Sequence, residues 1–86
     1  MKGQRVFNAE TYELREGEYT YYVREKSWYA HCPGPGRLIA NLSGHQVTEH
    51  MDDRTITVIP SIRCGNGSLG NTYHGHLTRG VWIQCQ

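Results

Sequence analysis

Short runs of alternating apolar and polar residues, broken by glycine, proline and asparagine, follow one another along this chain. The alternation is clearest in residues 18–25 (EYTYYVRE) and 27–32 (SWYAHC). No stretch keeps apolar residues at positions i, i+3, i+4 and i+7 for three turns, the pattern of an amphipathic helix. Because these runs are rich in tyrosine, valine, isoleucine, threonine and tryptophan, they predict an all-β domain of about six to eight short antiparallel strands, arranged as a sheet or sandwich.

Turn signals between the runs set the expected strand limits. A tight turn is expected near Glu25-Lys26, and Thr78-Arg79-Gly80 is expected to close a hairpin in which Gly80 takes a positive φ. The glycine-rich stretch 65–71 (GNGSLGN) is expected to be a loop. Further strands are expected at 4–7, 37–42, 46–49, 55–59, 72–77 and 81–85. Residues 1–15 are expected to be a loosely attached strand and loop.

We expect the 86 residues to form one domain, 1–86. A domain of this size buries a small hydrophobic core, so a metal ion or a covalent cross-link would add needed stability. The formal charge is +1, and the absence of a basic patch disfavours nonspecific nucleic-acid binding. No apolar run approaches the roughly 20 residues of a membrane span, and no signal peptide is visible. The sequence therefore predicts no membrane partner and a cytoplasmic location.

Three cysteines raise the possibility of a metal site. The stretch CPGPG at 32–36 is similar to a zinc knuckle with Pro35 in place of the second cysteine. An odd cysteine count suits a disulfide framework poorly, and metal binding or simple burial suits a reducing compartment better. Taken alone, CPGPG favours a tight turn between two strands over a metal site.

The expected hairpin at the C-terminal end favours the metal. Pairing of 72–77 with 81–85 would bring His74 near Cys85, with Cys64 entering just before and Cys32 ending a neighbouring strand. Three thiolates and one imidazole form a closed structural Zn²⁺ site. His76, two residues from His74, would face the same side and is the substitute ligand. Burial of the cysteines as small apolar side chains remains the alternative.

Three motifs together resemble an uncharacterised family of short phage and prophage proteins. They are WYAHCPGPG, TITVIPSI and YHGHLTRGVWIQC, which cover roughly residues 27–86. The resemblance implies that Cys32, Cys64, His74 and Cys85 occupy presumed metal-ligand positions, that the protein comes from a phage or prophage, and that it carries zinc. Pro35 departs from the family's second knuckle cysteine. The family supplies no activity to carry over.

Catalysis is not expected. A zinc hydrolase, the third function considered, would use His74 and His76 with Glu49 or Asp53 as acid or base. Ser61 lacks the glycine-flanked elbow of serine hydrolases. His31 and Cys32 are adjacent on a strand and so face opposite ways.

Binding is the favoured function. Residues 19–29 hold five tyrosine or tryptophan side chains, of which alternation can bury only about half. We expect Tyr19, Tyr21 and Tyr29, flanked by Arg24 and Arg37, to form an exposed aromatic face of the kind that protein interfaces favour. The partner expected from the resemblance and the small size is a host protein that the protein inhibits.

Two alternatives to a host-protein partner stay open. The same side chains could bind a nucleotide or single-stranded nucleic acid, or they could only cover a small sheet. A strand edge near residues 4–7 would also allow a homodimer.

Overall fold

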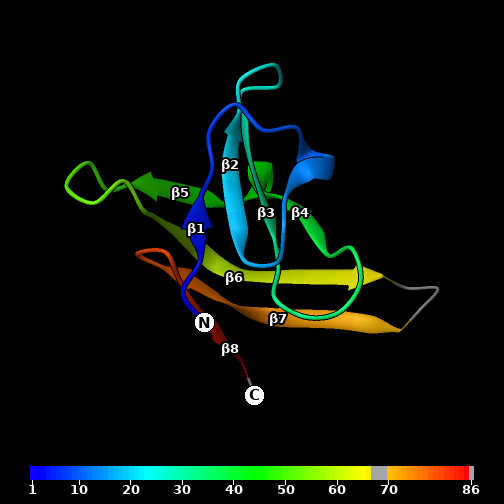
Figure 1. The fold of residues 1–86 in the computed structure, drawn as a ribbon. Coiled ribbons are helices and arrows are strands. Elements are labelled where there is room, and N and C mark those ends of the chain that lie inside the picture. Colours follow the sequence, from blue (N-terminus) through cyan, green and yellow to red (C-terminus); the bar gives the residue numbers. More distant parts are fainter. Residues whose placement is uncertain (67–69, 86) are drawn as a thin grey trace.

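A computed structural model describes residues 1–66 and 70–85 and confirms the all-β fold (Figure 1). Eight strands in this part of the chain form two sheets of four, in the orders β1-β2-β3-β4 and β5-β6-β7-β8. The strands are β1 (Gln4–Arg5), β2 (Glu18–Tyr22), β3 (Ser27–His31), β4 (Ile39–Asn41), β5 (Gln46–Glu49), β6 (Ile56–Asn66), β7 (Asn71–Thr78) and β8 (Val81–Gln84). The helical elements in the described part of the chain are two short 3-10 helices, η1 (Thr11–Glu13) and η2 (Leu42–Gly44). Neither is long enough to cross a membrane.

Neighbouring strands are antiparallel, with one exception. β1 runs parallel to β2, with Gln4 opposite Glu18 and Arg5 opposite Tyr19. The chain between them carries η1, which gives the crossover that a parallel pair requires. The expectation of a purely antiparallel arrangement was therefore wrong at this edge.

The N-terminal residues are tied to both sheets. The Met1 amino group donates to the carbonyl of Trp82 at 3.1 Å, and the Trp82 N–H donates back to the Met1 carbonyl at 2.8 Å. The Gly3 N–H donates to the carbonyl of Gly80 at 2.7 Å. Directly after Gly3, β1 pairs with β2 in the other sheet, so the N-terminal segment bridges the two layers.

The long strand β6 replaces the shorter strand expected at 55–59. It continues through a cis peptide bond at Ile59–Pro60, with a register shift between Val58 and Ile62. The expected loop at 65–71 is narrower, because β6 extends to Asn66 and β7 begins at Asn71; residues 67–69 lie outside the described residues. The hairpin between β7 and β8 is confirmed, with Gly80 at φ 74°.

The core lies between the sheets and draws on both. β2 and β3 run across β6 and β7 in Figure 1, and the facing side chains are buried. These are Tyr19, Ala30, Cys32, Leu38, Leu42, Ile56, Val58, Ile62, Cys64, Tyr73, Leu77 and Trp82. The Tyr73 and Trp82 rings meet edge to face at 5.6 Å, and the Trp82 Nε1–H donates to the Gly17 carbonyl at 3.0 Å. The indole N–H of Trp82 is thus hydrogen-bonded inside the core.

The segment around η1 is held near the opposite face of the first sheet. Leu14, Thr20 and His31 are buried there. The Arg37 guanidinium donates to the carbonyls of Leu14 at 2.8 Å and Tyr12 at 2.6 Å. Arg37, expected to contact a partner, is exposed and also holds the segment around η1 in place through these bonds.

Candidate functional site

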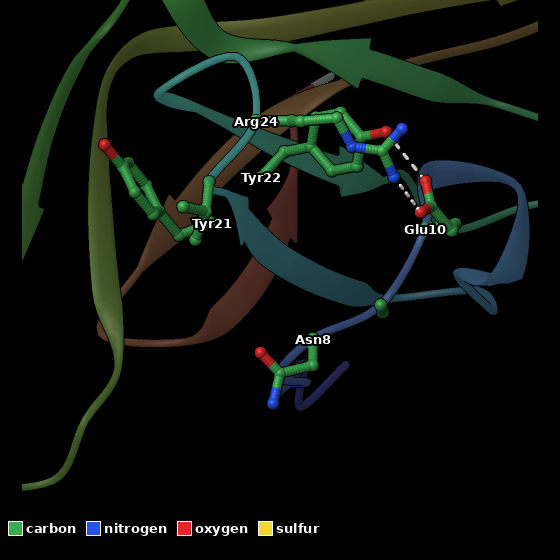
Figure 2. A pocket seen from close by; sticks show the side chains of 7 residues that line it. Asn8, Glu10, Tyr21, Tyr22 and Arg24 are labelled. Atoms are coloured by element: carbon green, nitrogen blue, oxygen red, sulfur yellow. Dashed lines mark hydrogen bonds and ion pairs between the residues drawn. The ribbon is translucent and has the colours of Figure 1, made fainter.

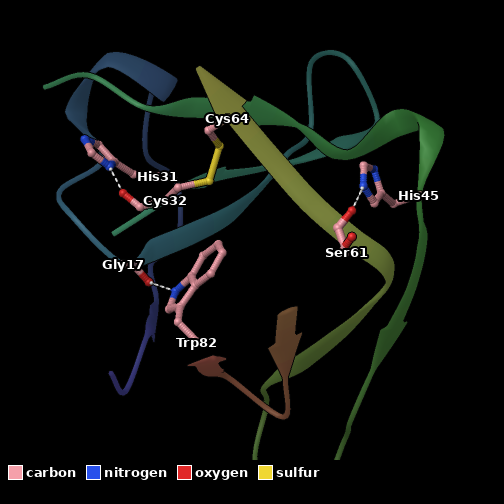
Figure 3. The surroundings of a disulfide bond; sticks show 7 residues. All are labelled: Gly17, His31, Cys32, His45, Ser61, Cys64 and Trp82. Atoms are coloured by element: carbon pink, nitrogen blue, oxygen red, sulfur yellow. Dashed lines mark hydrogen bonds between the residues drawn. A yellow bond between two sulfur atoms is a disulfide. The ribbon is translucent and has the colours of Figure 1, made fainter. Parts of the chain in front are cut away.

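Two of the expected zinc ligands are joined to each other. The sulfur atoms of Cys32 and Cys64 form a disulfide with an S–S distance of 2.06 Å (Figure 3). Cys32 directly follows β3 in the first sheet, and Cys64 lies in β6 of the second. The two layers are therefore linked by a sulfur–sulfur bond, which occupies the two thiols that were expected to bind a metal.

The remaining expected ligands lie elsewhere. Cys64 is paired with Tyr73 across β6 and β7, and both side chains face the core. Alternation along β7 then directs the next residue, His74, and with it His76, to the opposite face. Cys85 is a free, half-buried thiol beside His74 at the end of the hairpin.

These residues do not fit a common tetrahedral site. Across residues 1–66 and 70–85 there is no group of three or more His, Cys, Asp or Glu side chains that could hold a metal ion.

Ser61 and His74 form a contact that the sequence did not predict. The Ser61 Oγ lies 2.8 Å from His74 Nε2, and the His45 Nε2–H donates to the Ser61 carbonyl at 3.1 Å. Figure 3 shows the second of these bonds. A hydroxyl beside an imidazole is the first requirement of a nucleophile and base. The pockets at β1, at β2 and at Trp82 are lined by other residues, so the pair has no evident substrate space in them.

The three tyrosines expected to share an exposed face do not share one. Tyr19 is buried, with 1% of its surface exposed, whereas Tyr21 is 38% exposed. Tyr21 is paired with Trp28, and Tyr29 is paired with Thr20 on the other face of the sheet. The expectation was wrong for Tyr19 because Tyr19 lies opposite Ala30, whose small side chain leaves room for the ring in the core.

The face that holds Tyr29 is a network of polar contacts. The Tyr22 hydroxyl donates to the Glu10 carboxylate at 2.7 Å, and this bond raises the pKa of Tyr22. Arg24 forms an ion pair with the same carboxylate (Figure 2). The Tyr29 hydroxyl donates to Glu25 at 2.6 Å, which likewise raises the pKa of Tyr29. Tyr29 is thus bonded within the protein, whereas Arg24 is paired with Glu10 and its side chain stays 72% exposed.

Two exposed aromatic side chains, Phe7 and Tyr21, lie instead with the half-buried Trp28 around Arg5. Its guanidinium carbon lies 4.6 Å from the centre of the Phe7 ring and 4.8 Å from that of Trp28. Tyr21 meets Trp28 edge to face at 5.3 Å, and it points away from Tyr22 and Arg24 in Figure 2. We call Arg5, Phe7, Tyr21 and Trp28 the Arg5 cluster.

Polar contacts fix the arginine at the centre of the cluster. Arg5 Nη1 donates to the Glu49 carboxylate at 2.5 Å and to the Arg54 carbonyl at 3.2 Å. Glu49 ends β5 in the second sheet, so the arginine also links the two layers. Because the guanidinium contacts both rings and is fixed by two hydrogen bonds, the rings around it are held in place before any partner arrives.

Two pockets flank the cluster. The hairpin pocket, of about 330 Å³, is lined by residues 8–10 and 21–24. The N-terminal pocket, of about 460 Å³, is lined by residues 2–5, 7, 19 and 53–55. Both volumes lie within the usual range of ligand pockets. The surface therefore combines exposed rings with two hollows.

Sequence reasoning found Tyr21 but missed Arg5 and Phe7. Both lie in the segment whose pairing partner the sequence left open. In an extended chain, residues two apart point to the same side. The spacing of Arg5 and Phe7 was therefore the sequence feature that could have predicted their contact. Comparisons of the chain with family models, with curated proteins and with solved structures found no match.

Proposed function

We propose that this protein acts without catalysis, by binding another protein through the Arg5 cluster. The observation that carries the proposal is the contact of the Arg5 guanidinium with both the Phe7 and the Trp28 ring while Phe7 stays 59% exposed. Tryptophan, tyrosine and arginine dominate binding energy at protein interfaces. A surface that is already ordered loses little side-chain entropy when a partner binds.

The exposed surface also has a suitable mixture of groups. Val23, at the tip of the β2–β3 hairpin beside Tyr21, is 70% exposed. Exposed apolar side chains next to aromatic rings and hydrogen-bonding groups suit the buried centre of an interface. Charged side chains, such as Lys2 on one side and Arg24 on the other, supply its rim.

The resemblance of residues 27–86 to phage and prophage proteins gives this proposal its specific form. The partner would be a host protein, and binding would inhibit it. A disulfide is rare in the reducing cytosol, so the Cys32–Cys64 bond favours an oxidising compartment over the cytoplasmic location expected from the sequence.

Affinity capture with matched variants tests the proposal. Wild-type protein, Phe7→Ala and Tyr12→Ala would each be immobilised and exposed to a bacterial lysate. Tyr12 is 73% exposed but lies in η1, outside the cluster. The expected result is one partner retained by wild type and Tyr12→Ala and lost by Phe7→Ala. Equal retention by all three proteins would reject the Arg5 cluster as the binding surface.

A further inference from the structure

The N-terminal pocket has an excess of positive charge. Lys2, Arg5 and Arg54 line it, together with one acidic residue, Asp53. Asp53 accepts hydrogen bonds from the Thr55 N–H at 3.1 Å and the Thr55 hydroxyl at 2.7 Å, and these bonds lower its pKa. Its second oxygen lies 3.5 Å from Arg79. The negative charge of Asp53 is therefore compensated from outside the pocket.

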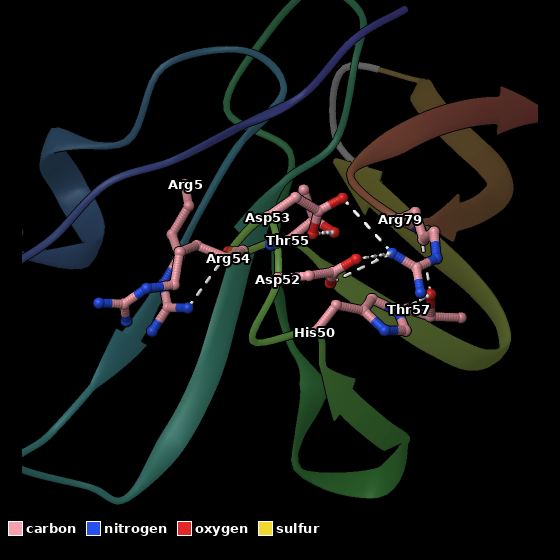
Figure 4. Close-up of polar contacts among 8 residues, drawn as sticks. All are labelled: Arg5, His50, Asp52, Asp53, Arg54, Thr55, Thr57 and Arg79. Carbon is pink, nitrogen blue, oxygen red and sulfur yellow. Dashed lines mark hydrogen bonds and ion pairs between the residues drawn. The ribbon is translucent and has the colours of Figure 1, made fainter.

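The charges of Lys2 and Arg54 are not neutralised in this way. The Glu49 carboxylate is paired with Arg5 and not with either of them. In the described part of the chain, neither Lys2 nor Arg54 has a carboxylate within ion-pair distance. Figure 4 shows Arg5 and Arg54 extending to one side, while Asp52 and Asp53 turn toward Arg79 on the other. The Nε of Arg5 is buried and has no hydrogen-bond partner among the described residues.

The backbone holds Arg54 in an unusual conformation. Arg54 has φ 64°, in the left-handed region that favours glycine. Its N–H donates to the His50 carbonyl at 2.8 Å, and its own carbonyl accepts from Arg5. A strained residue that the surrounding structure fixes is a feature of ligand sites. Here the strain places a cation at the pocket.

We propose that the N-terminal pocket binds a nucleotide, either free or within a single strand. Lys2 and Arg54 would hold the phosphate, since ammonium and guanidinium groups form strong hydrogen bonds to phosphate oxygens. One face of Phe7 is occupied by Arg5, and the ring remains 59% exposed, so a base can stack on its free face. A volume of about 460 Å³ accommodates a ligand of this size.

This inference goes beyond the proposed protein-binding function and can be tested separately, because Arg54 lies outside the Arg5 cluster. The probes are adenosine 5′-monophosphate, adenosine, inorganic phosphate, a short oligothymidylate and a phosphotyrosine peptide. Binding would be followed by titration calorimetry at low salt. The informative variant is Arg54→Gly. It removes the guanidinium, and glycine adopts the positive φ of this position without strain.

The matched control is Lys26→Gly. Lys26 also has a positive φ, 53°, and carries the same charge, but it lies in the β2–β3 turn and lines neither pocket. Circular dichroism would establish that both variants keep the wild-type fold.

The expected result is saturable binding of adenosine 5′-monophosphate with a Kd of about 1 mM or lower. Arg54→Gly should weaken binding about tenfold, and Lys26→Gly should not change it. Adenosine and inorganic phosphate should each bind more weakly than the monophosphate. Binding of the oligothymidylate more tightly than the monophosphate would identify a single strand as the source of the nucleotide, and the reverse order would identify the free nucleotide.

Three results would overturn the inference. The first is no binding of any nucleotide to the wild type. The second is equal weakening by Arg54→Gly and Lys26→Gly, which would indicate a general charge effect. The third is tighter binding of the phosphotyrosine peptide than of every nucleotide, which would assign the pocket to a phosphorylated protein.

Discussion

Cys32 and Cys64 are 32 residues apart in the chain and join the first sheet to the second through a disulfide. Both side chains are buried in the core. A covalent bond at this point limits the freedom of the unfolded chain, and its contribution to stability grows with the length of the loop it closes.

Removal of this disulfide should lower the free energy of unfolding by about 3 to 4 kcal/mol, the value expected for a loop of this length. Cys64→Ser and reduction with dithiothreitol should have similar effects in urea unfolding. Cys85→Ser is the control, because Cys85 is a free thiol, and it should change stability little.

The same experiment decides between the disulfide and the zinc site expected from the sequence. With the disulfide, addition of a chelator should leave the unfolding curve unchanged. Stoichiometric zinc in the purified protein together with unfolding by chelator would contradict the disulfide account, because a structural metal contributes directly to folding free energy.

Arg5→Lys should lower the free energy of unfolding by about 1 to 2 kcal/mol. A lysine lacks the planar guanidinium that contacts both the Phe7 and the Trp28 ring while bonding to Glu49. The tryptophan fluorescence should change as well, because Trp28 loses its neighbour. Arg63→Lys, at an exposed position of β6, is the matched control. If both variants are equally stable, the stacking of Arg5 contributes nothing measurable.

Gly75→Ala should destabilise the protein by about 1 to 3 kcal/mol through overpacking. A Cβ at this position would lie 2.6 Å from the Ile83 carbonyl oxygen and would also collide with the Tyr73 hydroxyl. Gly44→Ala is the control, since a Cβ there meets nothing within 4 Å. Thermal unfolding of the two variants measures the difference. A Gly75→Ala protein as stable as Gly44→Ala would mean that Tyr73 does not lie over β7.

Tyr19 should contribute to a loss of stability in alkaline solution. Burial raises the pKa of Tyr19 above the 10.0 of an exposed tyrosine, against the opposing effect of Arg5. A group with a raised folded-state pKa contributes stability that is fully present below its unfolded-state pKa and is lost as the pH rises through the folded-state value. The free energy of unfolding should therefore begin to fall near pH 10.

Urea unfolding at a series of pH values above and below 10 measures this loss. Tyr19→Phe should reduce the loss, since the titrating hydroxyl is gone, whereas Tyr12→Phe, at an exposed position, should leave it unchanged. A loss of the same size in the wild type and Tyr19→Phe would show that another group is responsible.

Much of the fold follows from local sequence pattern. β5 has the limits that were expected, and β7 and β8 lie within one residue of theirs. Their turn chemistry is also local, as Gly80 illustrates with its positive φ. The length of β6 was not predictable in this way, because Pro60 normally ends a strand, and here a cis peptide bond and a register shift carry the chain past it.

The candidate site depended on contacts that no local pattern contains. Arg5 meets Trp28 only because β1 pairs with β2, which in turn pairs with β3. Alternation correctly placed Tyr29 and Trp28 on opposite faces of their strand. It could not show that Tyr19 lies across from Ala30, where the tyrosine ring fits in the core. Likewise, an odd cysteine count did not reveal that Cys32 and Cys64 face each other from different sheets.

Hydrogen–deuterium exchange with and without the captured partner is the most direct test of the Arg5 cluster as the binding surface. Complex formation should slow amide exchange in residues 5–8, 21–24 and 27–29, which carry the cluster and the adjoining hairpin. Exchange in β7 and β8 should stay as it is in the free protein. Slowed exchange confined to β7 and β8, with none around Arg5, would contradict the account.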